Sequence, residues 1–491
     1  MSKTREHKTK KELESNKNGK LVRQVENMLR KKNSEEIMSM SLDEIKRSLN
    51  SGKISVCVVG VGRIGLPTAL SFANAGLHTI GIDTNTKLVD MINSGDHPLK
   101  DEPDFDKIFN IVTSNKTFYL TTDIAQAVPK SDVILLSLPT PMDKDHVPDY
   151  SALISVGRSL NKLLEHGSII IVESTIEPGF VENELIQIIE GKDKRLIAGK
   201  DFGIGVCPET ANPGEISKDF AKLPRLVGAI DEKTKNIIME IYHHVFPVDI
   251  IPLPDCKTAN AVKLTTNVFR DINIAFINEL ALLFEKLGID TMTVLEAAKS
   301  KYNFQVHYPG AGVGGPCLPV NSYQLLNSAK KFGNDFLKII SAGREINESM
   351  PDHVVDLICD SFAQAKLSIK GSIILCLGVS YKPDVKDIQL SPAESIIKKL
   401  RELGAEVRIY DPYFKNAQVF NIKTESDIAD AVKGVDGVIL ITSHKEFHDL
   451  KPSFLASRMK TPIVVDSRGI IDPHAAKKAG LIFRGLGRGN I

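Results

Sequence analysis

Short, uninterrupted apolar runs alternate with longer segments of helical periodicity from Ile54 onward. Such runs recur up to residue 230, among them "ISVCVVG", "HTIGID" and "SIIIVES". Fully apolar strands of this length, separated by helical stretches, are typical of a parallel sheet covered by helices on both faces. The pattern therefore predicts an α/β domain that begins near Ile54.

The segment from Thr258 to Gly288 has a different pattern. It contains no proline and no internal glycine, which predicts one long helix rather than an ordinary crossover. Beyond it, apolar runs resume in "GSIILCLG", "GAEVRIYD", "GVILITS" and "TPIVVDS". The chain is thus expected to form an α/β domain, a helical connector and a second α/β domain.

These patterns also set the expected domain boundaries. We place the first α/β domain at residues 51–255, the central helical domain at 256–350 and the second α/β domain at 351–491. Residues 1–50 are rich in Lys, Glu, Asn and Ser, and we expect a basic, partly disordered extension there. Within it, "SLDEIKRSLNSGK" predicts a short helix.

Composition restricts the class of protein. A chain of 491 residues is too long for one ordinary core, and its formal net charge of +1 argues against nucleic-acid binding as the main function. The N-terminus lacks the apolar region of a signal peptide, and no apolar run is long enough to span a bilayer. The six cysteines form no CxxC pair, and His444 and His448 lack a third metal ligand nearby. We therefore expect a cytoplasmic protein with no metal, no nucleic acid and no membrane among its partners.

A glycine motif directly follows the first strand. "GVGRIG" comprises Gly60, Val61, Gly62, Arg63, Ile64 and Gly65, and matches the GxGxxG pattern of dinucleotide-binding turns. Its glycines allow a tight turn, close approach of the backbone to a pyrophosphate, and close packing of helix against strand. Asp83 ends the next strand, where a carboxylate can bind both ribose hydroxyls and repels a 2′-phosphate. The motif predicts a site for NAD rather than NADP.

Two further features have more than one interpretation on the residues alone. Lys263, Asn267 and Arg270 or Asp271 share one face of the long helix, either as a solvated stripe or as the wall of a cleft. Cys317 stands in "PGAGVGGPCLPVN", where it is either a core residue or a nucleophile on a constrained loop.

Taken together, the motifs resemble those of the UDP-glucose/GDP-mannose dehydrogenase family. The resemblance covers nearly everything from Lys53 to the C-terminus. It rests, in the family's order, on "GVGRIGLP", "LPTPMDKDHVPDYS", "ESTIEPG", "CPE", "AVKLTTNVFRDINIAFINE", "GAGVGGPCLPVN", "GVSYKPDVKD" and "VVDSRGI". It implies a Rossmann-type NAD domain, a central helical domain and a Rossmann-like UDP-binding domain. It also implies oxidation of the C6 alcohol of a nucleotide sugar to a carboxylate, with two NAD⁺ reduced.

The resemblance assigns roles to particular residues. Cys317 matches the family's nucleophile, which forms a thiohemiacetal and then a thioester. Lys263 and Asn267 match the pair that stabilises the oxyanion, and Glu209 matches the acid/base glutamate. Thr140 and Thr175 are expected along the cofactor, and Thr175 also beside the hydrolytic water. The substrate-binding positions are Arg270, Gly314, Lys382 and Arg468, together with Glu209, Lys263 and Asn267.

The resemblance leaves three questions. Asn321 stands where the family usually has Asp, so activation of the water is expected to fall to Glu209 or Thr175. Arg270–Asp271 and "TSHKEF" favour the N-acetylhexosamine branch, with UDP-N-acetyl-D-mannosamine ahead of UDP-N-acetyl-D-glucosamine and UDP-glucose. A homodimer through the long helix is expected, or a higher homo-oligomer. The alternatives are a two-electron hydroxyacid dehydrogenase, which needs no thiol, and a non-catalytic NAD- or UDP-binding regulator.

Overall fold

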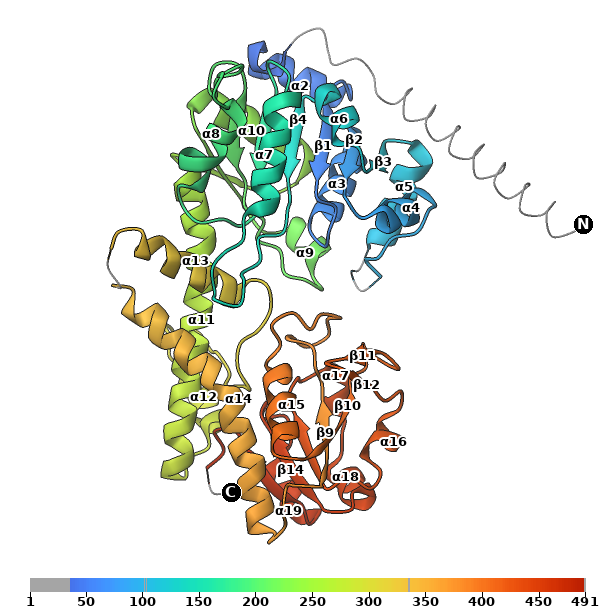
Figure 1. Ribbon diagram of the computed structural model, residues 1–491, viewed down its shortest axis with the longest axis vertical. Coiled ribbons are helices and arrows are strands. Elements are labelled where there is room, and N and C mark those ends of the chain that lie inside the picture. The colour runs from blue at the N-terminus through green and yellow to red at the C-terminus, as the bar shows by residue number, and fades with distance from the viewer. Residues whose placement is uncertain (1–35, 101, 103, 334–335, 490–491) are drawn as a thin grey trace, which may run out of the picture. The chain divides into compact units, whose positions relative to one another are not determined.

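The computed structural model describes residues 36–100, 102, 104–333 and 336–489. The chain divides into two compact units, one within residues 1–143 and 148–263 and the other within 144–147 and 264–491. Each unit is built around its own sheet, in which most neighbouring strands are parallel (Figure 1). The disorder expected for the start of the extension concerns residues 1–35, which lie outside the described residues.

The first unit contains a sheet in the order β3-β2-β1-β4-β5-β6-β7-β8. Its strands are β1 (Ser55–Val59), β2 (His78–Ile82), β3 (Phe118–Thr121), β4 (Val133–Leu136), β5 (Ile169–Val172), β6 (Gly203–Val206), β7 (Arg225–Ala229) and β8 (Ile250–Pro252). The order reverses at β1, which is the topological switch point where open α/β sheets bind their ligands.

The expectation of a wholly parallel sheet is wrong at one pair of strands. β7 runs antiparallel to β6, with Gly205 opposite Ala229, and β8 then runs parallel to β7. The connection from β6 to β7 holds only the short helix α9 (Ile216–Phe220) and returns along the edge that it left. β7 therefore begins at the edge of the sheet where β6 ends.

Helices cover both faces of the first sheet, as the apolar runs predicted. Val56 and Val58 contribute to one core, whereas Cys57 and Val59 contribute to the other. Figure 1 shows α7 in front of β4 on one of these faces. The remaining elements are η1 (Ile37–Ser39), α2 (Leu42–Asn50), α3 (Gly65–Asn74), α4 (Thr86–Asn93), α5 (Phe105–Asn115), α6 (Ile124–Ala127), η2 (Val128–Lys130), α7 (Ser151–Leu163), η3 (Val181–Leu185), α8 (Ile186–Glu190) and α10 (Glu232–Val245).

The described end of the N-terminal extension is folded onto the first unit. Helix α2 starts with a capping box, in which Ser41 N donates to Glu44 Oε2 over 2.8 Å. Its apolar face places Ile45 and Leu49 in the same core as α3 and α10. Residues 42–50 therefore form an additional helix that packs against the core on one face of the first sheet.

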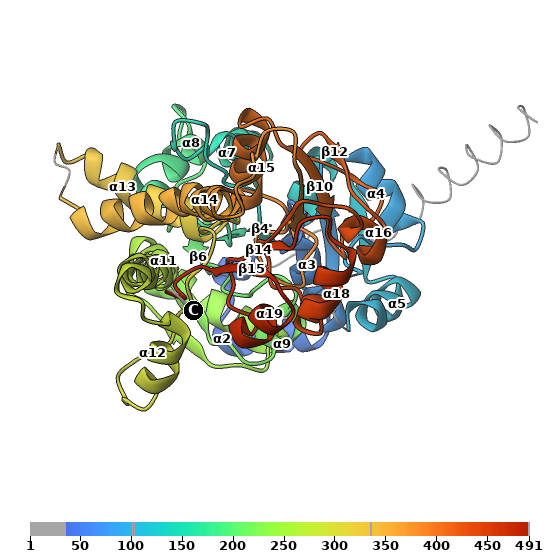
Figure 2. The same cartoon turned by 90° about the horizontal axis from the view of Figure 1, so that it is seen from below.

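The second unit repeats the same architecture on a smaller scale. Its main sheet has the order β10-β9-β13-β14-β15, and every pair of neighbours in it is parallel. Its strands are β9 (Ile373–Leu377), β10 (Glu406–Tyr410), β13 (Gly437–Leu440), β14 (Ile463–Asp466) and β15 (Ile482–Gly485), with a separate pair β11 (Gln418–Val419) and β12 (Ile422–Lys423). Figure 2 shows α14 and α15 on one side of β14 and β15, and α18 and α19 on the other.

The predicted long helix is α11 (Cys256–Leu287), which starts two residues before the expected Thr258. The other helices are α12 (Thr291–Ala298), α13 (Leu318–Lys330), α14 (Lys338–Gln364), α15 (Pro392–Glu402), α16 (Ile428–Val432), α17 (Lys445–His448), α18 (Pro452–Arg458) and α19 (Pro473–Lys478). Among the described residues, none of these helices combines the length and the low polarity needed to cross a bilayer.

Leu49→Ala tests whether α2 belongs structurally to the first unit. The Leu49 side chain is 2 % exposed, so its truncation leaves a cavity and is expected to cost about 3 kcal/mol. Hydrogen exchange measured by mass spectrometry should report faster exchange of the α10 amides in this variant. Leu42→Ala is the matched control, because Leu42 lies on the same helix but is 40 % exposed. Equal exchange in α10 for both variants would contradict the assignment.

Candidate active site

The candidate residues of the first unit collect at one edge of its sheet. Gly60 and Asp83 follow β1 and β2, while Thr140, Thr175 and Glu209 follow β4, β5 and β6. Because these five strands are parallel, their carboxyl ends meet at the same edge. Residues that are far apart in the sequence are thereby placed around one cofactor-binding edge.

The three motif glycines occupy three different environments. Gly60 has a φ of +88°, and a Cβ there would lie 2.5 Å from the Ser137 carbonyl oxygen. A Cβ at Gly65 would lie 1.8 Å from the carbonyl oxygen of Gly60, so helix α3 can approach the strand only without a side chain. A Cβ at Gly62 would meet nothing within 4 Å. The backbone at Gly62 therefore faces open space, as close approach of a pyrophosphate requires.

Asp83 is held against this turn. Its Oδ2 accepts from Val61 N over 3.1 Å, and its Oδ1 accepts from Asn85 N over 2.9 Å. The carboxylate is fixed at the end of β2, where it suits a ribose diol and disfavours a 2′-phosphate. These residues fit NAD, whose pyrophosphate would lie on the Gly60–Gly65 turn and whose ribose would lie beside Asp83.

Two of the motif's three non-glycine side chains, those of Arg63 and Ile64, contact other parts of the first unit. Arg63 Nη2 lies 3.1 Å from Glu102 Oε1, and the buried Glu102 also accepts from Gly214 N and Ile216 N. Ile64 packs against the core beneath the turn. The dinucleotide turn is thus linked through Glu102 to the loop that follows β6.

The loops after β4 and β5 are joined by direct hydrogen bonds. Thr140 Oγ1 donates to the Thr175 carbonyl oxygen over 2.7 Å, and Leu138 N donates to Ser174 Oγ over 2.8 Å. Thr140 and Thr175, assigned separately from the sequence, therefore belong to one connected pair of loops.

Glu209 is anchored on both carboxylate oxygens. Its Oε1 accepts from the backbone N–H groups of Thr210 and Ala211, each over 2.7 Å. Its Oε2 forms an ion pair with Arg225 Nη1, and both side chains are buried. Arg225 was not predicted as a site residue, because a single arginine at the start of a strand has no sequence pattern that marks it as functional.

A second buried carboxyl group lies in the same region and was also missed. Glu173 is 3 % exposed, and its Oε1 accepts from the Tyr242 hydroxyl over 2.7 Å. Burial, together with the nearby Glu209 charge, raises the pKa of Glu173 to about 7. The available signal was its position, a glutamate directly after the fully apolar strand β5.

In the second unit, the cysteine loop is packed closely on its surroundings. A Cβ at Gly310 would lie 2.3 Å from Arg468 Nη1, and a Cβ at Gly314 would lie 2.3 Å from the Leu390 carbonyl oxygen. Gly310 N also donates to Asn278 Oδ1 over 2.9 Å. These close approaches explain why the segment before Cys317 is rich in glycine.

Cys317 differs from the other cysteines in its exposure. All six thiols are free; Cys317 is exposed at the N-cap of α13, whereas the other five are buried or half-buried. Burial raises the pKa of those five thiols, which are Cys57, Cys207, Cys256, Cys359 and Cys376. Cys317 is therefore the cysteine with the accessibility that a nucleophile needs.

Asn321 lies one helical turn beyond Cys317 and connects two helices. Its Oδ1 accepts from Asn267 Nδ2 over 2.5 Å, and its Nδ2 donates to Gln324 Oε1 over 3.0 Å. An aspartate could not make the second of these bonds, since an ionised carboxylate has no donor. With an aspartate at 321, Gln324 would have to present its Nε2 donor in place of its Oε1.

The polar stripe on α11 contains residues in different environments. Lys263 is 7 % exposed, and Asn267 one turn later is half-buried. Arg270 is exposed, whereas Asp271 is 1 % exposed and receives hydrogen bonds from Arg344 Nη1 over 2.9 and 3.1 Å. Asp271 therefore holds α11 against α14, and Arg270 is the member of the pair that is open to a ligand.

Asn260 extends the same face of α11 and was missed from the sequence. Its side chain is 1 % exposed, and neither of its amide atoms has a hydrogen-bond partner among the described residues. It lies three residues before Lys263, so the two side chains share a helix face.

Lys382 and Arg468 follow strands β9 and β14 at the carboxyl edge of the second sheet. Arg468 Nε donates to the Ile441 carbonyl oxygen over 2.7 Å, which fixes its side chain beside the loop after β13. Nearby, His444 Nε2 lies 3.0 Å from Asp411 Oδ2. No group of three or more potential metal-ligating side chains is found within the described residues.

Glu173→Gln tests the buried carboxyl group through the pH dependence of stability. The folded protein retains a proton on Glu173 that the unfolded chain loses above its ordinary pKa of 4.5. The stability of the parent should therefore fall, relative to that of the variant, by roughly 3 kcal/mol as the pH rises through 4.5 to about 7. Unfolding curves at acid and alkaline pH measure this difference. Exposed Glu165→Gln is the control, and an identical pH dependence in the parent and both variants would contradict the assignment.

Comparison with known proteins identifies the three main parts of the chain. Residues 54–246, 257–349 and 375–473 match the NAD binding, central and UDP binding domains of the UDP-glucose/GDP-mannose dehydrogenase family. The UDP-N-acetyl-D-mannosamine dehydrogenase of Pyrococcus horikoshii is 34% identical over 89% of this chain and 100% of its own length. A UDP-N-acetyl-D-glucosamine 6-dehydrogenase of Pseudomonas aeruginosa is 30% identical over 81% of this chain and 92% of its own.

A solved structure agrees with these sequence matches. The structure of the UDP-D-ManNAc dehydrogenase from Pyrococcus horikoshii aligns with a TM-score of 0.82 at 33% identity. The alignment covers 89% of this chain and 100% of the other. The chain therefore belongs to the UDP-glucose/GDP-mannose dehydrogenase family and is an NAD-dependent nucleotide-sugar dehydrogenase.

Proposed function

We propose that this enzyme oxidises the C6 alcohol of a UDP-N-acetylhexosamine to the carboxylate in two NAD-dependent steps. The observation that carries the proposal is Cys317, the exposed thiol among six free cysteines, on a glycine-rich loop at the start of α13. Bound NAD supplies a hydride acceptor for each step. A four-electron oxidation needs in addition a group that retains the aldehyde between the two steps, and an exposed thiol can do so.

The reaction balances with Cys317 as the covalent carrier. Loss of a proton and a hydride converts the alcohol into an aldehyde, and the Cys317 sulfur then adds to its carbonyl carbon. The resulting thiohemiacetal loses a second proton and hydride to become a thioester. Water attacks the thioester, the C–S bond breaks, and the carboxylate and the free thiol are released.

The remaining roles follow the chemistry of each side chain. Lys263 and Asn267 stabilise the charge that develops on the C6 oxygen, since a cation and an amide donor suit an oxyanion. Glu209 takes the proton of the hydrolytic water, which Thr175 helps to place. Asn321 orients the Asn267 amide through the hydrogen bond between them.

The substrate is held by a separate set of groups. Arg270 and Gly314 lie along the substrate, and Lys382 and Arg468 bind the UDP portion or its sugar. These assignments are supported by the exposure of Arg270 and by the position of Lys382 and Arg468 at the carboxyl edge of a sheet in the UDP binding domain.

UDP-N-acetyl-D-mannosamine is the favoured sugar. Its support is that relatives such as the 34% identical protein of Pyrococcus horikoshii are UDP-N-acetyl-D-mannosamine dehydrogenases. UDP-N-acetyl-D-glucosamine is the second candidate, supported by the 30% identical Pseudomonas aeruginosa enzyme. The free state of all six cysteines suits a reducing compartment, and we place the enzyme in the cytoplasm.

We also infer that the enzyme forms a homodimer through α11. Phe269, Phe276, Leu283 and Leu287 recur at intervals of seven and four residues along this helix and are 52, 50, 49 and 60 % exposed. Large apolar side chains repeated on one helix face favour burial against a second copy.

Counting NADH per sugar consumed tests the proposed reaction. The parent enzyme should form two NADH with UDP-N-acetyl-D-mannosamine, and UDP-N-acetyl-D-glucosamine, UDP-glucose and GDP-mannose should react more slowly. Cys317→Ala should lose complete oxidation, because no group then retains the aldehyde. Cys359→Ala is the control, since Cys359 is a half-buried thiol outside the loop. Unchanged formation of the uronate by Cys317→Ala would refute the covalent mechanism.

Phe276→Lys tests the proposed dimer. A charge in the middle of the apolar face should shift the molar mass measured by light scattering toward that of a single chain. Ile111→Lys places the same charge on another exposed apolar residue, which is on α5 and 49 % exposed, and should leave the mass unchanged. A parent that is already monomeric, or a Phe276→Lys variant with the parent's mass, would refute the inference.

A further inference from the structure

A buried group of polar side chains surrounds Glu209 and has no role in the reaction as described so far. Arg225, Glu173, Tyr242 and Cys207 are each 3 % exposed or less. They come from the start of β7, the end of β5, helix α10 and the end of β6. Arg225 reaches this position because β7 runs antiparallel to β6 and begins where β6 ends.

The Arg225 side chain is fixed on three sides. Its Nη1 donates to Glu209 Oε2, while its Cζ lies 4.5 Å from the centre of the Phe220 ring and 4.1 Å from that of Phe246. Its Nε and Nη2 are buried and have no hydrogen-bond partner within the described part of the chain. Two rings therefore hold the guanidinium so that Glu209 receives its hydrogen bond.

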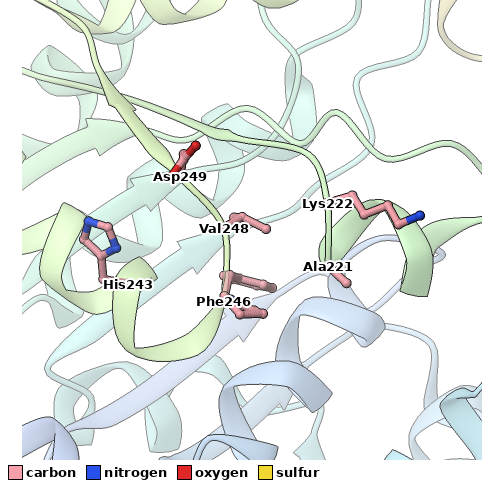
Figure 3. A pocket seen from close by; sticks show the side chains of 7 residues that line it. Ala221, Lys222, His243, Phe246, Val248 and Asp249 are labelled. Carbon is pink, nitrogen blue, oxygen red and sulfur yellow. The ribbon is translucent and has the colours of Figure 1, made fainter.

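Phe246 separates this group from the protein surface nearby. The same ring lines a depression of about 490 Å³ together with Lys222, His243 and Asp249 (Figure 3). No candidate catalytic residue lines that depression. The depression therefore lies beside the buried cluster and is not part of the candidate active site. The cluster contacts Glu209 instead.

The contacts of Glu209 leave its carboxylate with little freedom. A carboxylate has about four acceptor positions. The N–H groups of Thr210 and Ala211 occupy two on Oε1, and Arg225 occupies one on Oε2. One acceptor position therefore remains on Oε2, in an orientation that Arg225 determines.

The charges in the cluster are consistent with this arrangement. Arg225 is the cation that pairs with Glu209 and also acts electrostatically on Glu173, and the other titratable groups near them are Tyr242 and Cys207. Burial raises the pKa of Glu173 to about 7 and also raises those of Tyr242 and Cys207. Glu209 is the carboxylate that pairs with Arg225, and Glu173 retains its proton to a higher pH than an ordinary carboxyl group.

We propose that Arg225 is a positioning residue for the hydrolysis of the thioester: it orients Oε2 of Glu209 to accept the proton of the attacking water. In this step the water oxygen bonds to the thioester carbon, its proton passes to Glu209, and the Cys317 sulfur leaves. The inference rests on the proposed role of Glu209. Arg225 touches neither substrate nor cofactor in this account and acts through the carboxylate alone.

The test separates formation of the thioester from its hydrolysis. Arg225→Lys keeps the positive charge but loses the planar group that the two rings hold. We expect it to form the first NADH at the parent's rate, whereas hydrolysis slows about tenfold or more, as loss of an oriented charged hydrogen bond implies. Mass spectrometry of acid-quenched enzyme should then find the sugar attached at Cys317 in larger amount than in the parent.

Tyr242→Phe is the matched control. It removes the hydrogen bond to Glu173 within the same cluster and leaves the Arg225–Glu209 pair intact. It should hydrolyse the thioester at the parent's rate. If it accumulates as much adduct as Arg225→Lys, the effect belongs to the packing of the cluster and the inference is overturned.

Glu209→Gln, measured alongside, distinguishes the two levels of the proposal. If it accumulates adduct while Arg225→Lys does not, Arg225 has no positioning role and the role of Glu209 stands. If Glu209→Gln itself hydrolyses the thioester normally, the proposed role of Glu209 fails first.

If Arg225→Lys does not fold, a neutral Arg225→Met, Glu209→Gln double variant replaces it. Its hydrolysis should equal that of Glu209→Gln alone, and additional slowing would overturn the inference.

Discussion

The parallel alignment of the strands is the constraint on which the candidate site depends. Each parallel strand delivers the residue after its carboxyl end to the same edge of the sheet, whatever the distance along the chain. Gly60, Asp83, Thr175 and Glu209 meet in this way at the edge of the first sheet, and Lys382 and Arg468 at that of the second. Strands β7 and β8 run in the opposite direction and extend the rule, because β7 contributes its first residue, Arg225, to the same edge. A strand of either direction can therefore add a side chain to the site, from its end or from its beginning.

Close approach of the backbone to neighbouring groups is the second requirement, and it explains why glycines stand at several positions of the site. The turn at Gly60–Gly65 packs two elements more tightly than any side chain allows and leaves Gly62 facing open space. The cysteine loop uses the same principle, since Gly310 and Gly314 lie against Arg468 and the Leu390 carbonyl oxygen. Glycine costs conformational entropy. Here it brings a thiol-bearing loop and an arginine into direct contact within one unit.

Much of the fold could be predicted because buried parallel strands have a simple pattern. The apolar runs identified β1, β2, β4, β5, β6 and β7, and the absence of breakers identified α11. The short strands β3, β8, β11, β12 and β15 were missed; β8, for example, is only three residues long and mostly exposed. The direction of β7 was wrong because an apolar run specifies a strand but not its orientation.

The site was predictable only where a residue's role depends on local sequence. The glycine turn and Cys317 lie in distinctive motifs. The partners of Asp271 and Glu209 do not: Arg344 is 73 positions from Asp271, and Arg225 is 16 from Glu209. Such pairs depend on how helices and strands pack in the folded protein, and the spacing of charged residues in the sequence does not predict this packing.

The cluster around Glu209 shows why buried charges require their whole environment to be considered. Removing two carboxyl groups and a guanidinium from water is costly, and a buried ion pair seldom stabilises a protein more than apolar packing would. An arrangement with one cation and two ionised carboxylates would leave one charge unbalanced. The raised pKa of Glu173 reduces that excess, because its proton is retained to a higher pH, and the Tyr242 hydroxyl donates a hydrogen bond to one of its oxygens. The cost is concentrated at the edge of the sheet where the cofactor turn, the Glu209 loop and β7 converge. Proteins depart from local rules of stability mainly where function requires it. This cluster follows that pattern, because its contacts hold the Glu209 carboxylate in a single orientation.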